Sequence, residues 1–174
     1  MAIIATAGAN NANSYCDAAF ANAYFATRFN SAAWTIATDP NKETALIQAT
    51  IMLDSMFDWV GDIFNVNGNS SGQALRWPRY NAYDLDGRYL PTDSVPTVIK
   101  NAECEMAIFL LENQDYTGEI REIDRVRVSS ILVDFDNNAS NFPIATRVID
   151  MLRGYGSYKG QSKNAVGSVG LIRS

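Results

Sequence analysis

The sequence predicts a mainly α-helical protein: a small bundle of about four helices with a β-hairpin and an extended C-terminal arm. Apolar residues recur at helical spacing in several segments, alternate with polar residues in one, and give way to a glycine-rich segment after residue 153. At 174 residues, of which 47% are hydrophobic and 19% charged, the chain can build one domain with a core. We expect a helical domain over residues 1–153, with the hairpin near residues 120–136, and the arm over residues 154–174.

Two helices are predicted in the first third of the chain. Asp17 can cap a helix that runs from Ala18 to about Phe29. A second helix begins with Asp39 as N-cap and Pro40 in the first helical position, where a missing N–H costs nothing. Its core face is a row of apolar residues at helical spacing: Leu46, Ala49, Leu53, Met56, Phe57 and Val60.

The second half predicts two more helices, separated by the hairpin. Asp93 or Ser94 begins a helix that runs to about Glu112, and its second half should be buried nearly all round because apolar residues occupy both flanks. Apolar and polar residues alternate on both sides of Ser129–Ser130, a pattern that predicts a hairpin. Pro143 opens a short last helix.

The composition argues against catalysis. The chain contains no histidine, which removes the commonest general base and the commonest metal ligand together. The glycine-rich nucleotide loops and the nucleophile elbow are also missing. Cys16 and Cys104 lie outside any CxxC pair, and we interpret them as two small buried apolar side chains. We therefore expect no catalytic residue, no metal site and no cofactor, and we predict that the protein is not an enzyme.

The acidic residues that lie close together are interpreted as structural. The segment Asp84–Gly87 resembles the start of a calcium loop but lacks the distal glutamate, so we interpret it as a turn stabilised by its aspartates. Asp54 and Asp58 share helical spacing and are expected to be solvated. Glu103 and Glu105 are two residues apart and are expected to point in different directions.

Charge is unevenly distributed along the chain. It carries 14 Lys and Arg against 19 Asp and Glu, a net charge of −5. Because Gly154–Ser174 holds three basic residues and no acidic one, the remainder carries −8 and repels nucleic acid at long range. The basic arm fits an acidic protein surface or DNA, and its composition also fits a solvated terminus. No apolar run reaches the roughly 18–20 residues that a membrane span needs, and a cytoplasmic product is expected.

Aromatic and basic residues adjoin in the segment Arg76–Tyr80. Such a segment could stack nucleotide bases. The alternative, which the acidic body favours, is a tryptophan packed on the core with arginines that pair with carboxylates.

Several motifs of the chain are similar to a phage protein family. The most specific one consists of Gly72, Gln73, Ala74, Leu75, Arg76, Trp77, Pro78 and Arg79. It follows Asn13-Ser14-Tyr15 and the run Ala45–Thr50, and it precedes Tyr83–Gly87. The order and spacing of these motifs, over about Ala12 to Leu111, resemble the family of DnaT-like single-stranded DNA-binding proteins of phages.

Members of that family resemble the head–tail connector, or head-completion, proteins of tailed bacteriophages. This resemblance implies a structural adaptor that is made in the host cytoplasm and lies in the neck of the virion. It further implies a homo-oligomeric ring of about twelve copies that binds the portal protein and carries further neck or tail-completion proteins. Genomic DNA would pass through this ring without specific binding. We adopt this connector hypothesis because an acidic body fits poorly with a groove that follows a nucleic-acid backbone.

Two consequences follow for the expected site residues. Under the connector hypothesis the arm binds the portal, since alternating residues near its end can add a strand to a neighbour. The expected contacts are Lys159, Lys163, Val169, Leu171, Ile172 and Arg173. Under the alternative hypothesis the chain is a single-stranded DNA-binding replication protein, and its affinity depends on Trp77 and Arg79.

Overall fold

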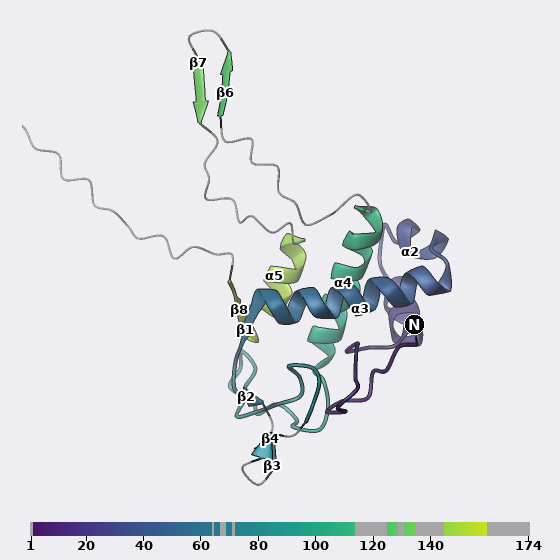
Figure 1. Ribbon diagram of the computed structural model, residues 1–174, viewed down its shortest axis with the longest axis vertical. Coiled ribbons are helices and arrows are strands. Elements are labelled where there is room, and N and C mark those ends of the chain that lie inside the picture. Colours follow the sequence, from purple (N-terminus) through teal and green to yellow (C-terminus); the bar gives the residue numbers. More distant parts are fainter. Residues whose placement is uncertain are drawn as a thin grey trace, which may run out of the picture.

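The computed structural model describes residues 2–63, 65–66, 69–70, 72–113, 125–128, 131–134 and 145–159 (Figure 1). Over these ranges it contains five helices and four antiparallel pairs of short strands, so the predicted mainly α class is confirmed. None of the helices described is long and apolar enough to cross a membrane. The expected arm contacts from Lys163 onward lie outside the described residues.

Helices α1 (Ala18–Ala26) and α2 (Ala32–Ile36) form a helical corner near the N-terminus. The side chain of Asp17 accepts a hydrogen bond of 2.8 Å from the backbone N–H of Phe20, which confirms it as the cap of α1. Helix α1 ends earlier than predicted because the chain turns at Asn30, whose φ of 58° lies in the left-handed region. The short helix α2 was not predicted.

Helix α3 (Asp39–Met56) is the longest helix, and α4 (Thr97–Glu112) is the central one. The N-cap of α3 is Thr38, so Asp39 and Pro40 lie one position further into the helix than predicted. Helix α4 contacts α1, α2, α3 and α5 (Thr146–Leu152), and Figure 1 shows α3 crossing it. Residues 102–108 of α4 are all buried, whereas residues 109–111 are half-buried and Glu112 is exposed, so the all-round burial predicted for the second half of the helix extends only to Ile108.

A strand pair closes the end of the bundle. Helix α3 stops at Met56 because the chain continues as β1 (Phe57–Trp59), which pairs with β8 (Gly156–Tyr158). Phe57 therefore lies on a strand and not on the predicted helix face, although its side chain is buried. Residues 156–158, the first part of the predicted arm, are part of the folded body.

The other strand pairs are short. They are β2 (Asp62–Ile63) with β5 (Arg79–Tyr80), β3 (Asn65–Val66) with β4 (Asn69–Ser70), and β6 (Arg125–Val128) with β7 (Ile131–Asp134). In the last pair Val128 lies opposite Ile131, so the predicted hairpin is confirmed.

A carboxyl group lies in the middle of the core. One oxygen of the fully buried Glu103 accepts hydrogen bonds from the Ser14 hydroxyl (2.6 Å), the Thr50 hydroxyl (2.7 Å) and the Tyr15 backbone N–H (3.2 Å). Its second oxygen has no hydrogen-bond partner. Burial raises the pKa of Glu103 to about 7, although these donors act against the rise. Glu103 thereby connects the N-terminal segment to α3 and α4.

The two cysteines lie beside this carboxyl group. Cys16 and Cys104 are both buried and free, with their sulfurs 3.8 Å apart. They fill the core as small side chains, which confirms the interpretation from the sequence.

Candidate functional site

Trp77 and Arg79 of the sequence motif are part of the core. Only 1% of Trp77 is exposed, and its ring lies edge-on to Trp59 with centroids 5.9 Å apart. The guanidinium of Arg79 donates hydrogen bonds to the carbonyls of Val60 and Gly61, both at 2.6 Å. Trp77 therefore lacks the exposed face that base stacking requires, and the interpretation as a core tryptophan is confirmed. Arg79 differs from that interpretation in binding backbone carbonyls and not carboxylates.

Asp54 holds the motif in place and is not solvated as expected. Its carboxylate accepts hydrogen bonds from the Tyr15 hydroxyl and from the Arg76 backbone N–H, the latter at 3.1 Å. Burial raises the pKa of Asp54, while the hydrogen bond from Tyr15 acts to lower it. Asp58, by contrast, is exposed as expected, and Lys159 lies 3.4 Å from it.

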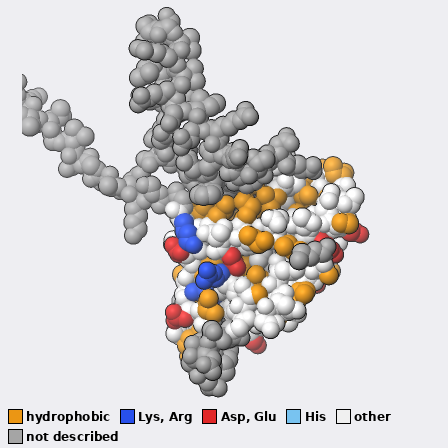
Figure 2. Space-filling view, viewed as in Figure 1, with side chains coloured by type: hydrophobic (Ala, Val, Ile, Leu, Met, Phe, Trp, Pro, Cys, Tyr) orange, Lys and Arg blue, Asp and Glu red, His pale blue; other side chains and the backbone are white. Residues whose placement is uncertain are grey.

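The edge of the molecule at β1 and β8 mixes both signs of charge. Figure 2 shows basic and acidic side chains side by side over these strands. A cavity of about 190 Å³ there is lined by Asp54, Phe57, Asp58, Trp59, Arg76, Arg79 and Lys159. The ammonium group of Lys159 also donates to the carbonyl of Ser55 at 3.0 Å. Because Asp54 and Asp58 line this cavity together with the cations and would repel a phosphate, this edge is a poor site for one.

The turn at Asp84–Gly87 is stabilised by its aspartates, as predicted. One oxygen of Asp84 accepts hydrogen bonds from the backbone N–H groups of Asp86 (3.0 Å) and Arg88 (2.8 Å). The guanidinium of Arg88 pairs with both carboxylates. This exposed arginine is therefore neutralised locally.

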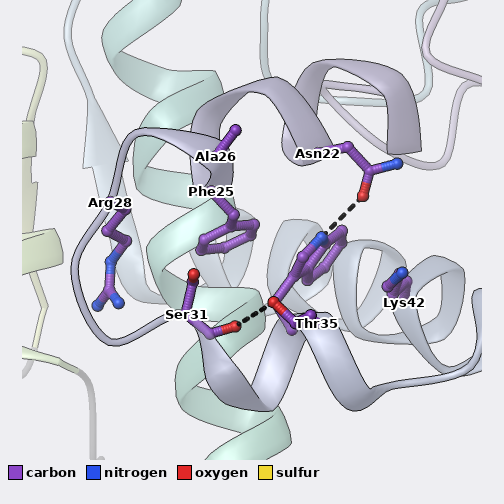
Figure 3. A pocket seen from close by; sticks show the side chains of 8 residues that line it. Asn22, Phe25, Ala26, Arg28, Ser31, Thr35 and Lys42 are labelled. Carbon is purple, nitrogen blue, oxygen red and sulfur yellow. Dashed lines mark hydrogen bonds between the residues drawn. The ribbon is translucent and has the colours of Figure 1, made fainter.

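Two adjoining hollows at the connection of α1 and α2 have a different lining. The larger one, about 340 Å³, is lined by Asn22, Phe25, Ala26, Arg28, Ser31, Trp34, Thr35 and Lys42 (Figure 3). The second, about 280 Å³, is lined by Tyr24, Thr27, Arg28, Phe29 and Arg147. Arg28 belongs to both, and within the part of the chain that the structure describes no carboxylate lines either of them. Basic and aromatic side chains therefore occur together here without an acidic neighbour in the lining.

Two aromatic rings, tilted by 31° to each other, line the larger hollow. The centroids of Phe25 and Trp34 are 4.6 Å apart, and the indole N–H of Trp34 donates to the amide oxygen of Asn22 at 2.9 Å. The ammonium group of Lys42 lies 5.7 Å from the centroid of the Trp34 ring, a cation–π distance. In Figure 3 Arg28 and Lys42 lie on opposite sides of the Phe25 ring.

The loop that contributes to both hollows exposes an apolar ring. Phe29 is 94% exposed, although it directly follows Arg28 at the end of α1. The guanidinium of Arg28 donates hydrogen bonds to the carbonyls of Phe29 (2.9 Å) and Asn30 (2.8 Å). These bonds, with the left-handed backbone of Asn30, fix the course of the loop.

Arg28 is anchored from below by Glu105 of α4. Its Nε and Nη2 donate to the two oxygens of Glu105 at 2.7 and 2.8 Å, a bidentate pair. Tyr24 donates its hydroxyl proton to the same carboxylate, and the Nε of Arg147 lies 3.4 Å from it. Burial acts to raise the pKa of Glu105. The hydrogen bonds from Arg28 and Tyr24 and the charge of Arg147 outweigh this effect, so the pKa lies below its usual value. Two guanidinium groups on one carboxylate leave a net positive charge.

The model of the family described as "Putative DnaT-like ssDNA binding protein" matches residues 1–173. The chain belongs to this family. The resemblance expected over Ala12 to Leu111 therefore extends over nearly the whole chain. No curated protein and no solved structure matches it.

The connector hypothesis is wrong. The family that covers the chain is described by single-stranded DNA binding, and nothing in the comparisons supports a head–tail connector. The predicted partners, namely the portal protein, further copies in a ring and further neck proteins, are therefore not supported. The expectation that DNA passes without being bound is wrong as well. The preference for that hypothesis relied on the charge of −8 over the body, which is a sum over many residues and does not describe the lining at α1 and α2, where the described residues include no carboxylate.

The residues of this lining were not singled out from the sequence. Phe29 was interpreted as the end of a helix, and Arg28 and Arg147 were not considered. One local signal was available: a phenylalanine between an arginine and an asparagine at a helix end has little apolar surface to pack on. No local sequence pattern predicts that Arg28 and Arg147 both contact Glu105, because Arg28 and Glu105 are 77 positions apart in the sequence.

Proposed function

We propose that the protein binds single-stranded DNA, without catalysis, at the α1–α2 surface, defined as Arg28, Phe29, Lys42 and Arg147. The family description names the ligand. One observation carries the choice of surface: the exposed Phe29 ring lines the second hollow beside Arg28 and Arg147, and among the described residues cations but no carboxylates line both hollows. An aromatic platform flanked by positive charge is the arrangement by which proteins bind single strands.

Phe29 supplies the stacking contact. Each base stacked on an aromatic side chain contributes about 1–3 kcal/mol, and the contact tolerates any base because every base has a π-face. Both faces of the Phe29 ring are accessible, since the side chain is 94% exposed. In a duplex the bases are already stacked on one another, so Phe29 favours single-stranded over double-stranded DNA.

Arg147 and Lys42 supply the phosphate contacts. The side chain of Arg147 is 60% exposed, and among the described residues it makes one ion pair, at 3.4 Å. Lys42 lines the larger hollow with a side chain that is 14% exposed, and its partner Asp39, 3.5 Å away, is 92% exposed and holds it only weakly. Arg28 is less available because most of its N–H groups already bind Glu105 and the loop carbonyls.

The acidic body limits the strength of binding. A net charge of −5 opposes the long-range attraction that brings basic proteins to DNA. With so few phosphate contacts we expect weak binding, with a Kd on the order of 10⁻⁴ to 10⁻⁶ M. Contacts of short range at Phe29 then make up a large share of the affinity.

Fluorescence anisotropy with a labelled single-stranded oligonucleotide tests the proposal. Phe29→Ala should weaken binding by about 5- to 100-fold, as expected when one stacked base is lost. Ile51→Ala is the matched control, since Ile51 is also an exposed apolar residue (55%) but lies on α3 outside both hollows. The proposal fails if the unaltered protein does not bind at low salt, or if Phe29→Ala binds as tightly as Ile51→Ala.

A further inference from the structure

We propose that Glu105, although it is negatively charged and buried, is a positioning residue for DNA binding. In this account Glu105 holds the Arg28–Ser31 loop in the conformation that exposes the Phe29 ring. The inference rests on the proposed function of the α1–α2 surface.

The contacts form one continuous path from α4 to Phe29. The carboxylate of Glu105, only 2% exposed, takes the Nε and Nη2 edge of the Arg28 guanidinium at 2.7 and 2.8 Å. The remaining nitrogen, Nη1, donates to the carbonyls of Phe29 and Asn30 at 2.9 and 2.8 Å. Four of the five N–H donors of this guanidinium are thereby occupied, two on each side. Glu105 fixes the plane of Arg28, and Arg28 fixes the backbone that carries Phe29.

The exposed ring explains why such an anchor is needed. Burial of an apolar side chain lowers the free energy of the protein in water. An unanchored loop would therefore tend to turn the exposed Phe29 ring onto neighbouring apolar surface. The backbone of Asn30 is also in the left-handed region, and the strain of that conformation would be relieved in other loop conformations. A loop that is ordered before binding does not lose conformational entropy when a base stacks on it.

Simple electrostatics makes the opposite prediction for this residue. A carboxylate beside a phosphate-binding surface repels DNA, so neutralising Glu105 should strengthen binding. Neutralisation would also release Arg147, whose Nε lies 3.4 Å from the carboxylate, for contact with phosphate. If Glu105 positions the loop, its neutralisation weakens binding instead. The two accounts differ in sign and not only in magnitude.

The test compares Glu105→Gln with Glu112→Gln in the anisotropy assay. Both variants remove one negative charge from α4, but Glu112 is exposed at the end of the helix. We expect Glu105→Gln to weaken single-strand binding by about 2- to 10-fold, the usual cost of ordering a side chain and loop on binding. Glu112→Gln should leave binding unchanged or strengthen it. Equal or tighter binding by Glu105→Gln overturns the inference and leaves the proposed function standing.

A double variant separates positioning from a general loss of structure. In the Phe29→Ala background, Glu105→Gln should no longer weaken binding, because the residue that it positions is gone. An equal loss in both backgrounds overturns the inference. If Glu105→Gln does not fold, Arg28→Lys replaces it, since lysine keeps the charge but cannot bridge Glu105 and the loop carbonyls. Unchanged binding by Arg28→Lys also overturns the inference. If the unaltered protein does not bind at all, the proposed function itself fails.

Discussion

Arg28 and Glu105 form a bidentate ion pair across the packing of α1 against α4, with N–O distances of 2.7 and 2.8 Å. The arginine is 17% exposed and the glutamate 2%. Removing one member of such a pair leaves the other charge buried without compensation, which is more damaging than replacing both. The pair therefore contributes to stability as well as to the loop that carries Phe29.

Arg28→Met should lower the free energy of unfolding by at most about 3 kcal/mol, below the usual cost because Arg147 and Tyr24 still contact Glu105. Combining it with Glu105→Leu should recover part of the loss. Arg88→Met is the control and should change stability little, because the Arg88 side chain is 74% exposed. Urea unfolding measures the free energy of unfolding of Arg28→Met, of the double variant and of Arg88→Met. A double variant less stable than Arg28→Met would contradict the prediction.

Stability should decrease as the pH rises from about 4 to about 7, because of Glu103. Burial raises the pKa of Glu103 to about 7 in the folded state, whereas a glutamate in the unfolded chain titrates near 4.3. Between these values the folded protein retains a proton that the unfolded chain releases. The stabilisation is therefore complete below about pH 4.3 and is lost by about pH 7, a change of roughly 4 kcal/mol.

Thermal unfolding of Glu103→Gln across this pH range checks the prediction. The glutamine cannot titrate, so the stability difference between the two proteins should change steadily from pH 4.3 to pH 7 and then level off. Glu112→Gln serves as the control for an exposed glutamate on the same helix. A difference that stays constant with pH would show that Glu103 titrates normally.

The salt dependence of DNA binding should report the phosphate contacts. For single strands each neutralised phosphate contributes about −0.7 to the slope of log K against log salt, so the two cations Lys42 and Arg147 predict a slope of about −1.4. Lys42→Met and Arg147→Met should each reduce that slope by about 0.7. Lys159→Met should leave it unchanged, because Lys159 pairs with Asp58 at the mixed edge of β1 and β8. A slope altered only by Lys159→Met would place the DNA at that edge.

Local sequence patterns predicted those elements whose formation is local. The Asp17 cap, the buried middle of α4 and the hairpin of β6 and β7 follow from neighbouring residues, and the structure confirms them. The pairing of β1 with β8 does not, since Phe57 lies opposite Tyr158 and no local pattern specifies so distant a partner. Helix α2 is too short for its periodicity to be recognised.

The candidate site was missed for a related reason. Its charge balance depends on which side chains meet in space, and the net charge of the chain carries no such information. Trp77 and Arg79 belong to the most specific motif, which runs from Gly72 to Arg79, but both are buried in the core. Phe29 lies outside every motif, and its exposure follows from the Arg28–Glu105 pair, which joins segments 77 positions apart.

The most direct test of the proposed surface is ultraviolet crosslinking to a single-stranded oligonucleotide that contains 5-bromodeoxyuridine, followed by tryptic peptide mapping. Trypsin cleaves after Arg28 and Lys42, so the peptide from Phe29 to Lys42 contains the exposed ring. If DNA binds at the α1–α2 surface, we expect this peptide to carry the main crosslink and Phe29→Ala to remove it. Crosslinks confined to other peptides, such as the one from Tyr80 to Arg88 with its exposed Tyr83, would contradict it.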